Sequence, residues 1–187
     1  MKVLRLLTTT LLLPLAAFAA ERPLKIDRDR SFVDVDVKVT IGSFTGHLDA
    51  FDAKVNVDDT GKIKSAIFAF KFADLRTGEP ERDSKMIAWL GGGAPEGRFE
   101  IGALALTSDG QGQVTGRLTF HDITELVEFP INVARDGGVY IITGETTIDY
   151  RHWNLKIIRI GLKLGKVDPE VKIRFKLTGS TSTEPKK

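Results

Sequence analysis

The sequence feature that most constrains the fold is strict alternation of apolar and polar residues, clearest in the segment Val114–Val133. Within each arm one parity carries the apolar residues, which are Val114, Leu118 and Phe120 in the first arm and Val127, Phe129, Ile131 and Val133 in the second. A period of two is typical of strands with one buried face. Between the two arms, His121–Thr124 has to reverse the chain, and Asp122 is the residue best able to adopt a left-handed backbone there. The segment therefore predicts an antiparallel β-hairpin.

Similar alternation recurs along the chain and predicts seven or eight strands, mostly joined by short turns. Besides the two hairpin arms, these are Ser31–Ile41, Leu48–Val57, Lys62–Leu75, Arg98–Thr107, Val139–Tyr150 and Val171–Leu177. We expect Pro23–Arg30 to be a charged lead-in and Gly42–Gly46 to be a break. Antiparallel strands at this spacing predict an all-β fold, either a sandwich or a closed barrel. Closure would remove exposed strand edges, and an eight-stranded barrel is just wide enough for one slender ligand.

One short helix is predicted at Pro80–Leu90, after the third strand. Proline stands at its start, acids lie in its first turn, and Gly91–Gly93 follows its end. The apolar residues Met86 and Trp89 either pack this helix on the sheet or form the underside of a lid that touches a ligand. The preceding strand has Phe68, Phe70 and Phe72 on one face, and we predict that this face and the helix line a tunnel.

The N-terminus has the pattern of a secretory signal peptide. Lys2 and Arg5 precede an apolar run, and Ala17-Phe18-Ala19 fits a signal-peptidase site. We therefore expect a signal peptide at residues 1–19 and one domain at residues 20–187. A membrane anchor is the alternative, but the run is shorter than the ~20 residues of a spanning helix. The chain has no cysteine, which excludes disulfides and cysteine-based metal sites.

Charge is distributed unevenly along the chain. Residues 21–149 contain 15 Lys and Arg against 22 Asp and Glu, whereas residues 150–187 contain 10 against 3. This asymmetry suggests an oriented surface, although basic residues on the solvent faces of late strands would give the same counts. We place Arg151, His152, Lys156 and Arg159 at the barrel mouth, where they would attract a lipid phosphate or an anionic membrane surface.

Motifs for catalysis, metal binding and nucleic-acid binding are missing from the sequence. The three histidines, His47, His121 and His152, are scattered and do not share a helix face. No nucleophile elbow or phosphate-binding glycine loop is present. The aromatic residues fall on inward parities instead of among the basic residues, which argues against nucleic acid. We predict no catalytic residue, no metal and no required cofactor.

Four segments in order resemble the YceI-like family. They are Ile26–Val35, Thr77-Gly78 with Arg82–Met86, the hairpin segment Gly116–Thr124 and, more loosely, Tyr150–Leu155. The resemblance implies a periplasmic, lipocalin-like eight-stranded barrel that binds a lipid or polyisoprenoid. Arg30 and Lys85 stand where the family has histidines, and Asp122 stands where it has a turn glycine, so these changes bear on ligand identity.

The function implied by this resemblance is to hold a long apolar lipid, such as an isoprenoid lipid or quinone, inside the barrel. The predicted ligand-binding residues are Phe68, Phe70, Phe72, Met86, Trp89, Phe120 and Trp153. Transient contact with a membrane surface is expected as well. The alternative is a non-catalytic interaction module whose barrel is filled by its own side chains, and an unrecognised enzyme is a third hypothesis. Oligomeric state does not follow from the sequence.

Overall fold

The computed structural model describes residues 21–159 and 165–181. The expected signal peptide lies outside the described residues. The strands are β1 (Arg22–Val39), β2 (Ser43–Leu48), β3 (Phe51–Val57), β4 (Ile63–Lys71), β5 (Leu75–Arg76), β6 (Glu96–Leu106), β7 (Gln111–Phe120), β8 (Ile123–Asp136), β9 (Val139–Asp149) and β10 (Val167–Thr181). The helical elements are the 3-10 turn η1 (Phe72–Asp74), the helix α1 (Pro80–Trp89) and the 3-10 turn η2 (Tyr150–Trp153).

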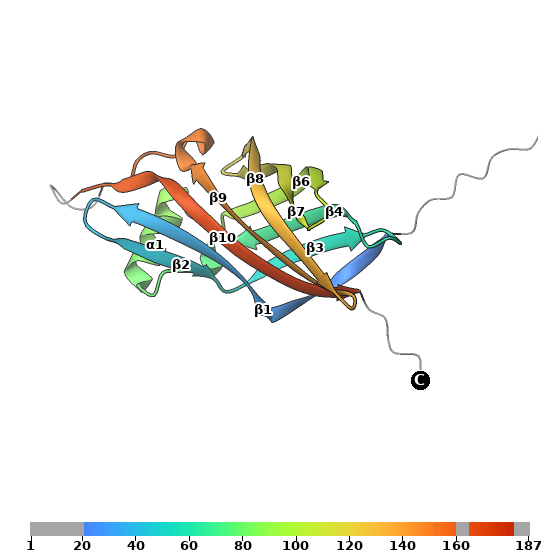
Figure 1. Cartoon of the computed structure of the whole chain (residues 1–187). Coiled ribbons are helices and arrows are strands. Elements are labelled where there is room, and N and C mark those ends of the chain that lie inside the picture. The colour runs from blue at the N-terminus through green and yellow to red at the C-terminus, as the bar shows by residue number, and fades with distance from the viewer. Residues whose placement is uncertain (1–20, 160–164, 182–187) are drawn as a thin grey trace, which may run out of the picture.

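Eight of these strands close into an antiparallel barrel, as predicted (Figure 1). Around the barrel the order is β1, β3, β4, β6, β7, β8, β9 and β10, and β10 pairs again with β1. Strand β1 pairs with β3 only at its first residues, Arg22 and Pro23, and its later half pairs with β2 instead. Strand β2 pairs in turn with β5. The barrel wall therefore splits at one end, and α1 lies at that end (Figure 1).

Two expectations about the first strands are wrong. Pro23–Arg30 is not a lead-in but the first part of β1, which pairs with β10 from Leu24 onward. The pairing register shifts between Asp27 and Phe32, where the strand bulges and bends, and Ser31 Oγ accepts a hydrogen bond from the backbone N–H of Thr178 (3.0 Å). Residues 43–48 are not a break but the separate strand β2.

The predicted hairpin is confirmed, with a tighter turn than expected. Phe120 pairs with Ile123, so the loop contains only two residues. Both His121 (φ 50°) and Asp122 (φ 59°) have a left-handed backbone. Positive φ at both central positions is the geometry that matches the twist of the adjoining strands.

Inside the barrel, three glycines lie beneath phenylalanine rings from adjacent strands. A Cβ atom at Gly97, Gly116 or Gly144 would fall 2.2 Å, 2.4 Å or 2.7 Å from the nearest ring carbon. The rings belong, in the same order, to Phe70, Phe99 and Phe175. Glycine at these inward positions lets the rings lie flat along the wall instead of projecting across the interior.

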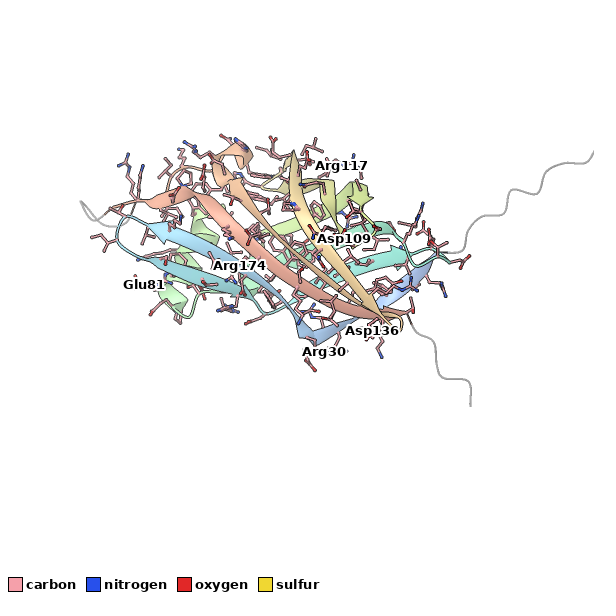
Figure 2. The ribbon with its side chains drawn as sticks, viewed as in Figure 1. Arg30, Glu81, Asp109, Arg117, Asp136 and Arg174 are labelled. Atoms are coloured by element: carbon pink, nitrogen blue, oxygen red, sulfur yellow. The ribbon has the colours of Figure 1, made fainter. Side chains whose placement is uncertain are left out.

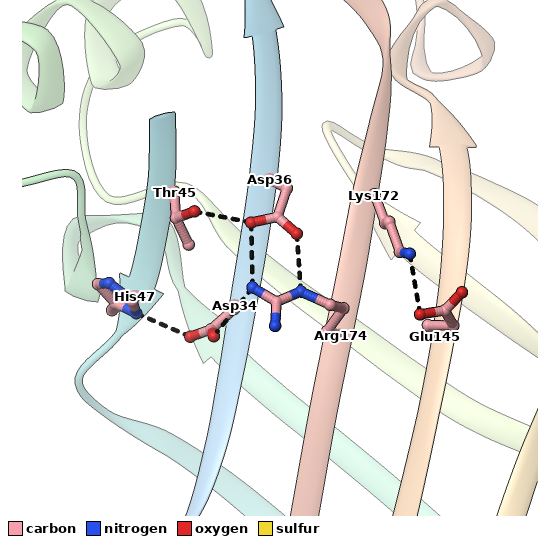
Figure 3. Close-up of polar contacts among 7 residues, drawn as sticks. All are labelled: Asp34, Asp36, Thr45, His47, Glu145, Lys172 and Arg174. Atoms are coloured by element: carbon pink, nitrogen blue, oxygen red, sulfur yellow. Dashed lines mark hydrogen bonds and ion pairs between the residues drawn. The ribbon is translucent and has the colours of Figure 1, made fainter. Parts of the chain in front are cut away.

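On the outer face, a polar network ties four neighbouring strands together (Figure 3). The Arg174 guanidinium on β10 donates to Asp36 on β1 through Nε (2.7 Å) and Nη2 (3.1 Å). Thr45 Oγ1 on β2 donates to Asp36 (2.7 Å), and Lys172 Nζ pairs with Glu145 on β9 (2.9 Å). Asp34 and Asp36 lie on the polar, solvent-facing parity of β1, and through their contacts with β2 and β10 they also hold the strands of the split wall together.

The helix α1 begins and ends almost as the sequence predicted. Pro80 occupies its first turn, and Gly91, Gly92 and Gly93 follow it with positive φ. Asp83 is buried and accepts hydrogen bonds from the backbone N–H (3.0 Å) and hydroxyl (2.6 Å) of Thr77, which fixes α1 to the segment after β5. Glu81 on α1 and Asp136 at the end of β8 mark opposite ends of the barrel (Figure 2). Among the described residues, none of the helical segments has the length and apolar character needed to cross a bilayer.

Candidate functional site: the barrel interior

The barrel is hollow and encloses a cavity of about 820 Å³. Inward side chains from all eight barrel strands line it, including Val35, Val55, Phe68, Ile101, Leu118, Phe129, Ile142 and Ile173. The volume lies within the ~300–1,000 Å³ typical of ligand sites. The barrel is therefore not filled by its own side chains, as the alternative of an interaction module had assumed.

Aromatic rings form one continuous wall of this cavity. Successive ring centroids are 5.9 Å apart from Phe68 to Phe70, 5.0 Å from Phe70 to Phe72 and 5.6 Å from Phe72 to Phe120. Tilted and edge-to-face pairs at these distances are mutually attractive. These four rings, which we call the aromatic ladder, form a long apolar surface that offers contact area without hydrogen-bonding groups.

The helix α1 contributes to the cavity lining as well. Met86 and Trp89 both face the cavity, as predicted from the sequence. Trp89 Nε1 donates to the backbone oxygen of Lys156 (2.7 Å), and its ring meets Tyr150 edge to face at 5.0 Å. These contacts connect the end of α1 to the segment after β9. Burial raises the pKa of the Tyr150 phenol, which stays neutral and donates to the backbone oxygen of Val167 (3.4 Å).

Trp153 is the predicted ligand residue that does not line the cavity. Its side chain is 1% exposed and stacks on the back of Phe120 with ring centroids 4.4 Å apart. Its Nε1 donates to the backbone oxygen of Leu118 (3.2 Å), and its own backbone oxygen lies 2.8 Å from His121 Nδ1. Trp153 therefore supports the aromatic wall from behind instead of contacting the cavity contents. Parity could not show this, because Trp153 lies in a 3-10 turn.

The mouth of the cavity lies beside α1, because the charged residues among its lining gather there. They are Glu79, Glu81, Arg82, Lys85 and Arg159, and all except half-buried Arg82 are exposed. Lys85 Nζ pairs with Glu81 (2.7 Å), and this contact holds the pKa of the Glu81 carboxyl below its usual value. The Arg82 guanidinium lies over the ring of Phe44, 4.1 Å from its centroid.

Only Arg159 of the four predicted mouth residues lines the cavity. Arg151 instead pairs with Asp149, through Nε at 2.9 Å and through Nη2, and this pair holds the pKa of the Asp149 carboxyl below its usual value. His152 and Lys156 are exposed and do not line the cavity. The predicted attraction of Arg151, His152 and Lys156 for a lipid phosphate or an anionic membrane surface stays a prediction.

The end of the barrel away from α1 is closed. Tyr140 on β9 is 1% exposed, and its hydroxyl donates to the backbone oxygen of Gly61 in the β3–β4 turn (3.1 Å). The Arg135 guanidinium lies over the Tyr140 ring at 5.3 Å and donates to the backbone oxygen of Thr60 (3.0 Å). Val57 is fully buried and belongs to the same core cluster as Tyr140. Within the described residues, the cavity is thus a tunnel that is blind at the end away from α1.

Several lining residues were missed because sequence parity does not reveal the split wall. Phe44, Gly46 and Leu48 of β2 line the cavity, and so do Leu75 and Thr77. The signal was present in the alternation of Phe44, Gly46 and Leu48, but the surrounding glycines suggested a break. Among the described residues there is no group of three or more histidine or carboxylate side chains that could hold a metal ion. The site is suited to holding an apolar chain by contact area.

The fold and its interior define the class: a hollow, lipocalin-like antiparallel β-barrel with an apolar blind tunnel. Comparison with protein-family models matches residues 24–179 to the YceI-like domain. The chain therefore belongs to the YceI-like family. A comparison with curated proteins finds no match.

Solved structures share the fold. BcnA of Burkholderia cenocepacia superposes with a TM-score of 0.69 at 23% identity, covering 82% of this chain and 99% of BcnA. A domain of Saccharophagus degradans described as polyisoprenoid-binding and implicated in plant cell wall breakdown has a TM-score of 0.64 at 16% identity, with 88% and 99% coverage. The YceI protein of Campylobacter jejuni has a TM-score of 0.63 at 13% identity, with 78% and 90% coverage.

Proposed function

We propose that this protein is a non-catalytic binding protein that holds one long apolar lipid, of the polyisoprenoid or isoprenoid-quinone class, in the barrel. The single observation that carries the proposal is the blind tunnel of about 820 Å³, whose interior is apolar and whose charged residues are confined to the mouth. The polyisoprenoid-binding description of the Saccharophagus degradans domain supports this ligand class.

The energetics favour a long chain. Each CH₂ group moved from water into an apolar site gains about 0.8 kcal/mol, so a chain of several isoprene units binds without specific polar contacts. The aromatic ladder Phe68–Phe70–Phe72–Phe120 supplies contact area along its length. Tyr140 closes the far end, so the depth of the tunnel sets a maximum chain length.

We further propose that the protein works in the periplasm and carries its lipid through water between membranes. Support comes from the signal-peptide pattern of residues 1–19 and from the mouth beside α1. A carrier needs an opening through which the lipid enters and leaves. The hydrogen bond from Trp89 to Lys156 connects α1 to the segment after β9.

Titration of lipid-free protein with polyprenols of increasing length tests the binding function. Trp89 lines the tunnel and Trp153 lies behind its wall, so the fluorescence of the wild type reports occupancy mainly through Trp89. We expect saturable binding that strengthens with chain length and then levels off when the tunnel is full. The Trp89→Phe variant should lose most of the signal while calorimetry still detects binding. Absence of saturable binding for every length would refute the proposal.

A further inference from the structure

An exposed apolar residue lies at the tip of the β1–β2 turn. Ile41 continues the inward parity of β1, and the alternation places it inside, yet it is 84% exposed. The chain leaves the strand after Val39, and the turn is closed by a hydrogen bond from the Val39 N–H to the Gly42 oxygen (3.1 Å). Ile41 has the highest exposed fraction of the large apolar side chains in the described part of the chain.

Backbone contacts place this turn next to basic residues at the cavity mouth. The Thr40 N–H donates to the Lys166 oxygen (3.1 Å), and the Lys166 N–H donates to Thr40 Oγ1 (2.9 Å). Lys166 in turn forms a β-bridge with Arg159, which lines the cavity. Ile157, two residues before Arg159, is 36% exposed, whereas the intervening Ile158 lines the cavity.

We define this basic rim as Lys38, Ile41, Lys156, Ile157, Arg159 and Lys166. All six residues are exposed, and none of its four cations has an ion-pair partner among residues 21–159 and 165–181. Lys62 and Lys64 on the β3–β4 side are also exposed and have no carboxylate partner among the described residues, so what distinguishes the rim is that its unpaired cations lie beside the exposed Ile41 and Ile157. Exposed apolar side chains beside unpaired Lys and Arg side chains are the combination that binds at an anionic lipid interface.

We infer that the basic rim docks the barrel on an anionic phospholipid bilayer, with Ile41 inserted between headgroups and the mouth facing the membrane. The inference deepens the proposed function, because a lipid could then pass between bilayer and tunnel with little exposure to water. Charge complementarity selects this partner: an anionic bilayer attracts each nearby Lys or Arg, and Ile41 gains by leaving water. A protein partner or a second copy of the chain would bury the same residues without requiring anionic lipid.

Sedimentation with vesicles tests the docking. The chain from Ala20 onward, which contains all the described elements, is mixed with vesicles of phosphatidylglycerol and phosphatidylcholine in equal parts, and with vesicles of phosphatidylcholine alone. We expect binding to the anionic vesicles that weakens as salt rises above ~0.1 M. Replacing Lys38 and Lys166 with Gln should lower the partition coefficient roughly ten- to thirtyfold at low salt. Ile41→Ser should lower it roughly fivefold.

Matched variants elsewhere on the barrel serve as controls. Lys62→Gln with Lys64→Gln removes two cations from the β3–β4 region, and Leu126→Ser removes an apolar side chain that is 71% exposed on β8. These variants should bind vesicles like the wild type. Polyprenol titration in vesicle-free solution should be unchanged in the rim variants, so loss of docking is distinguished from loss of lipid binding. Equal binding to neutral vesicles, equal losses in rim and control variants, or a dimer that Ile41→Ser dissociates would overturn the inference.

Discussion

The ring of Phe70 on β4 lies directly over Gly97, its pairing partner on β6, so that a Cβ atom at Gly97 would fall 2.2 Å from the ring. The missing side chain at Gly97 is what allows the ring to lie along the wall. Gly116 beneath Phe99 and Gly144 beneath Phe175 repeat this relationship. The hollow interior therefore depends on glycines as much as on the aromatic residues that line it.

The first prediction follows from this contact. Gly97→Ala should push the Phe70 ring into the tunnel, because the ring is the only flexible group in the clash. We expect weaker polyprenol binding by about tenfold and a loss of roughly 1–3 kcal/mol in the free energy of unfolding. Gly102→Ala on the same strand is the control, since its nearest neighbour would be an ordinary 3.4 Å away. If both variants bound polyprenol equally, the clash would not matter for function.

Tunnel depth gives the second prediction. Ala66 lines the tunnel and pairs with Val55 on β3, toward the closed end and the β3–β4 turn. Ala66→Phe should shorten the tunnel, so long polyprenols should lose affinity while short ones are little affected. Each excluded CH₂ costs about 0.8 kcal/mol. Ala69→Phe, on the same strand but outside the lining, should leave the length profile unchanged. Equal losses at every length would contradict the placement of the blind end.

The third prediction separates Trp153 from the ligand site. Trp153→Phe removes the hydrogen bond to Leu118 and leaves a void behind Phe120, so it should lower the free energy of unfolding by roughly 2 kcal/mol. The length preference for polyprenols should stay that of the wild type, because Trp153 does not line the tunnel. Denaturant unfolding and polyprenol titration measure the two effects. A changed length preference would mean that Trp153 contacts the ligand directly.

Much of this interior was predictable from the sequence. Inward parity identified the apolar faces of the central hairpin and of the strand containing Phe70, because a period of two determines which side chains share a face. Parity says nothing about how far apart opposite walls are, so parity alone could not show that the barrel is hollow, and a lipid inside the barrel was expected only from the family resemblance. It also failed at the bulge after Asp27, which interrupts the alternation of β1, and at Ile41, where the chain turns before the pattern ends.

The outer network provides the fourth prediction. Hydrogen bonds from Arg174 and then Thr45 hold the pKa of Asp36 below its ordinary value of 3.8. A carboxyl with a lowered pKa stabilises the fold fully above its ordinary pKa, and this contribution is lost as the pH falls through the lowered value. Asp36→Asn should therefore destabilise the protein by about 1 kcal/mol at neutral pH, given partial solvent screening.

The difference between wild type and Asp36→Asn should shrink as the pH falls below 3.8. Asp52→Asn on β3 is the control, because its ion pair with Lys54 at 3.7 Å is exposed on both sides and contributes little. Denaturant unfolding across the acid range measures both variants. A difference that stayed constant down to the lowest pH would show that Asp36 acts through packing and not through its charge.

Mass spectrometry of an organic extract tests most directly whether one long lipid occupies the tunnel. The wild type and Ala66→Phe are purified from the native host without detergent and extracted in parallel. We predict a single lipid class with a long apolar chain in the wild type, near one molecule per protein, and a shorter or less abundant chain in Ala66→Phe. A wild-type extract without lipid, or identical lipid in both proteins, would contradict the proposal.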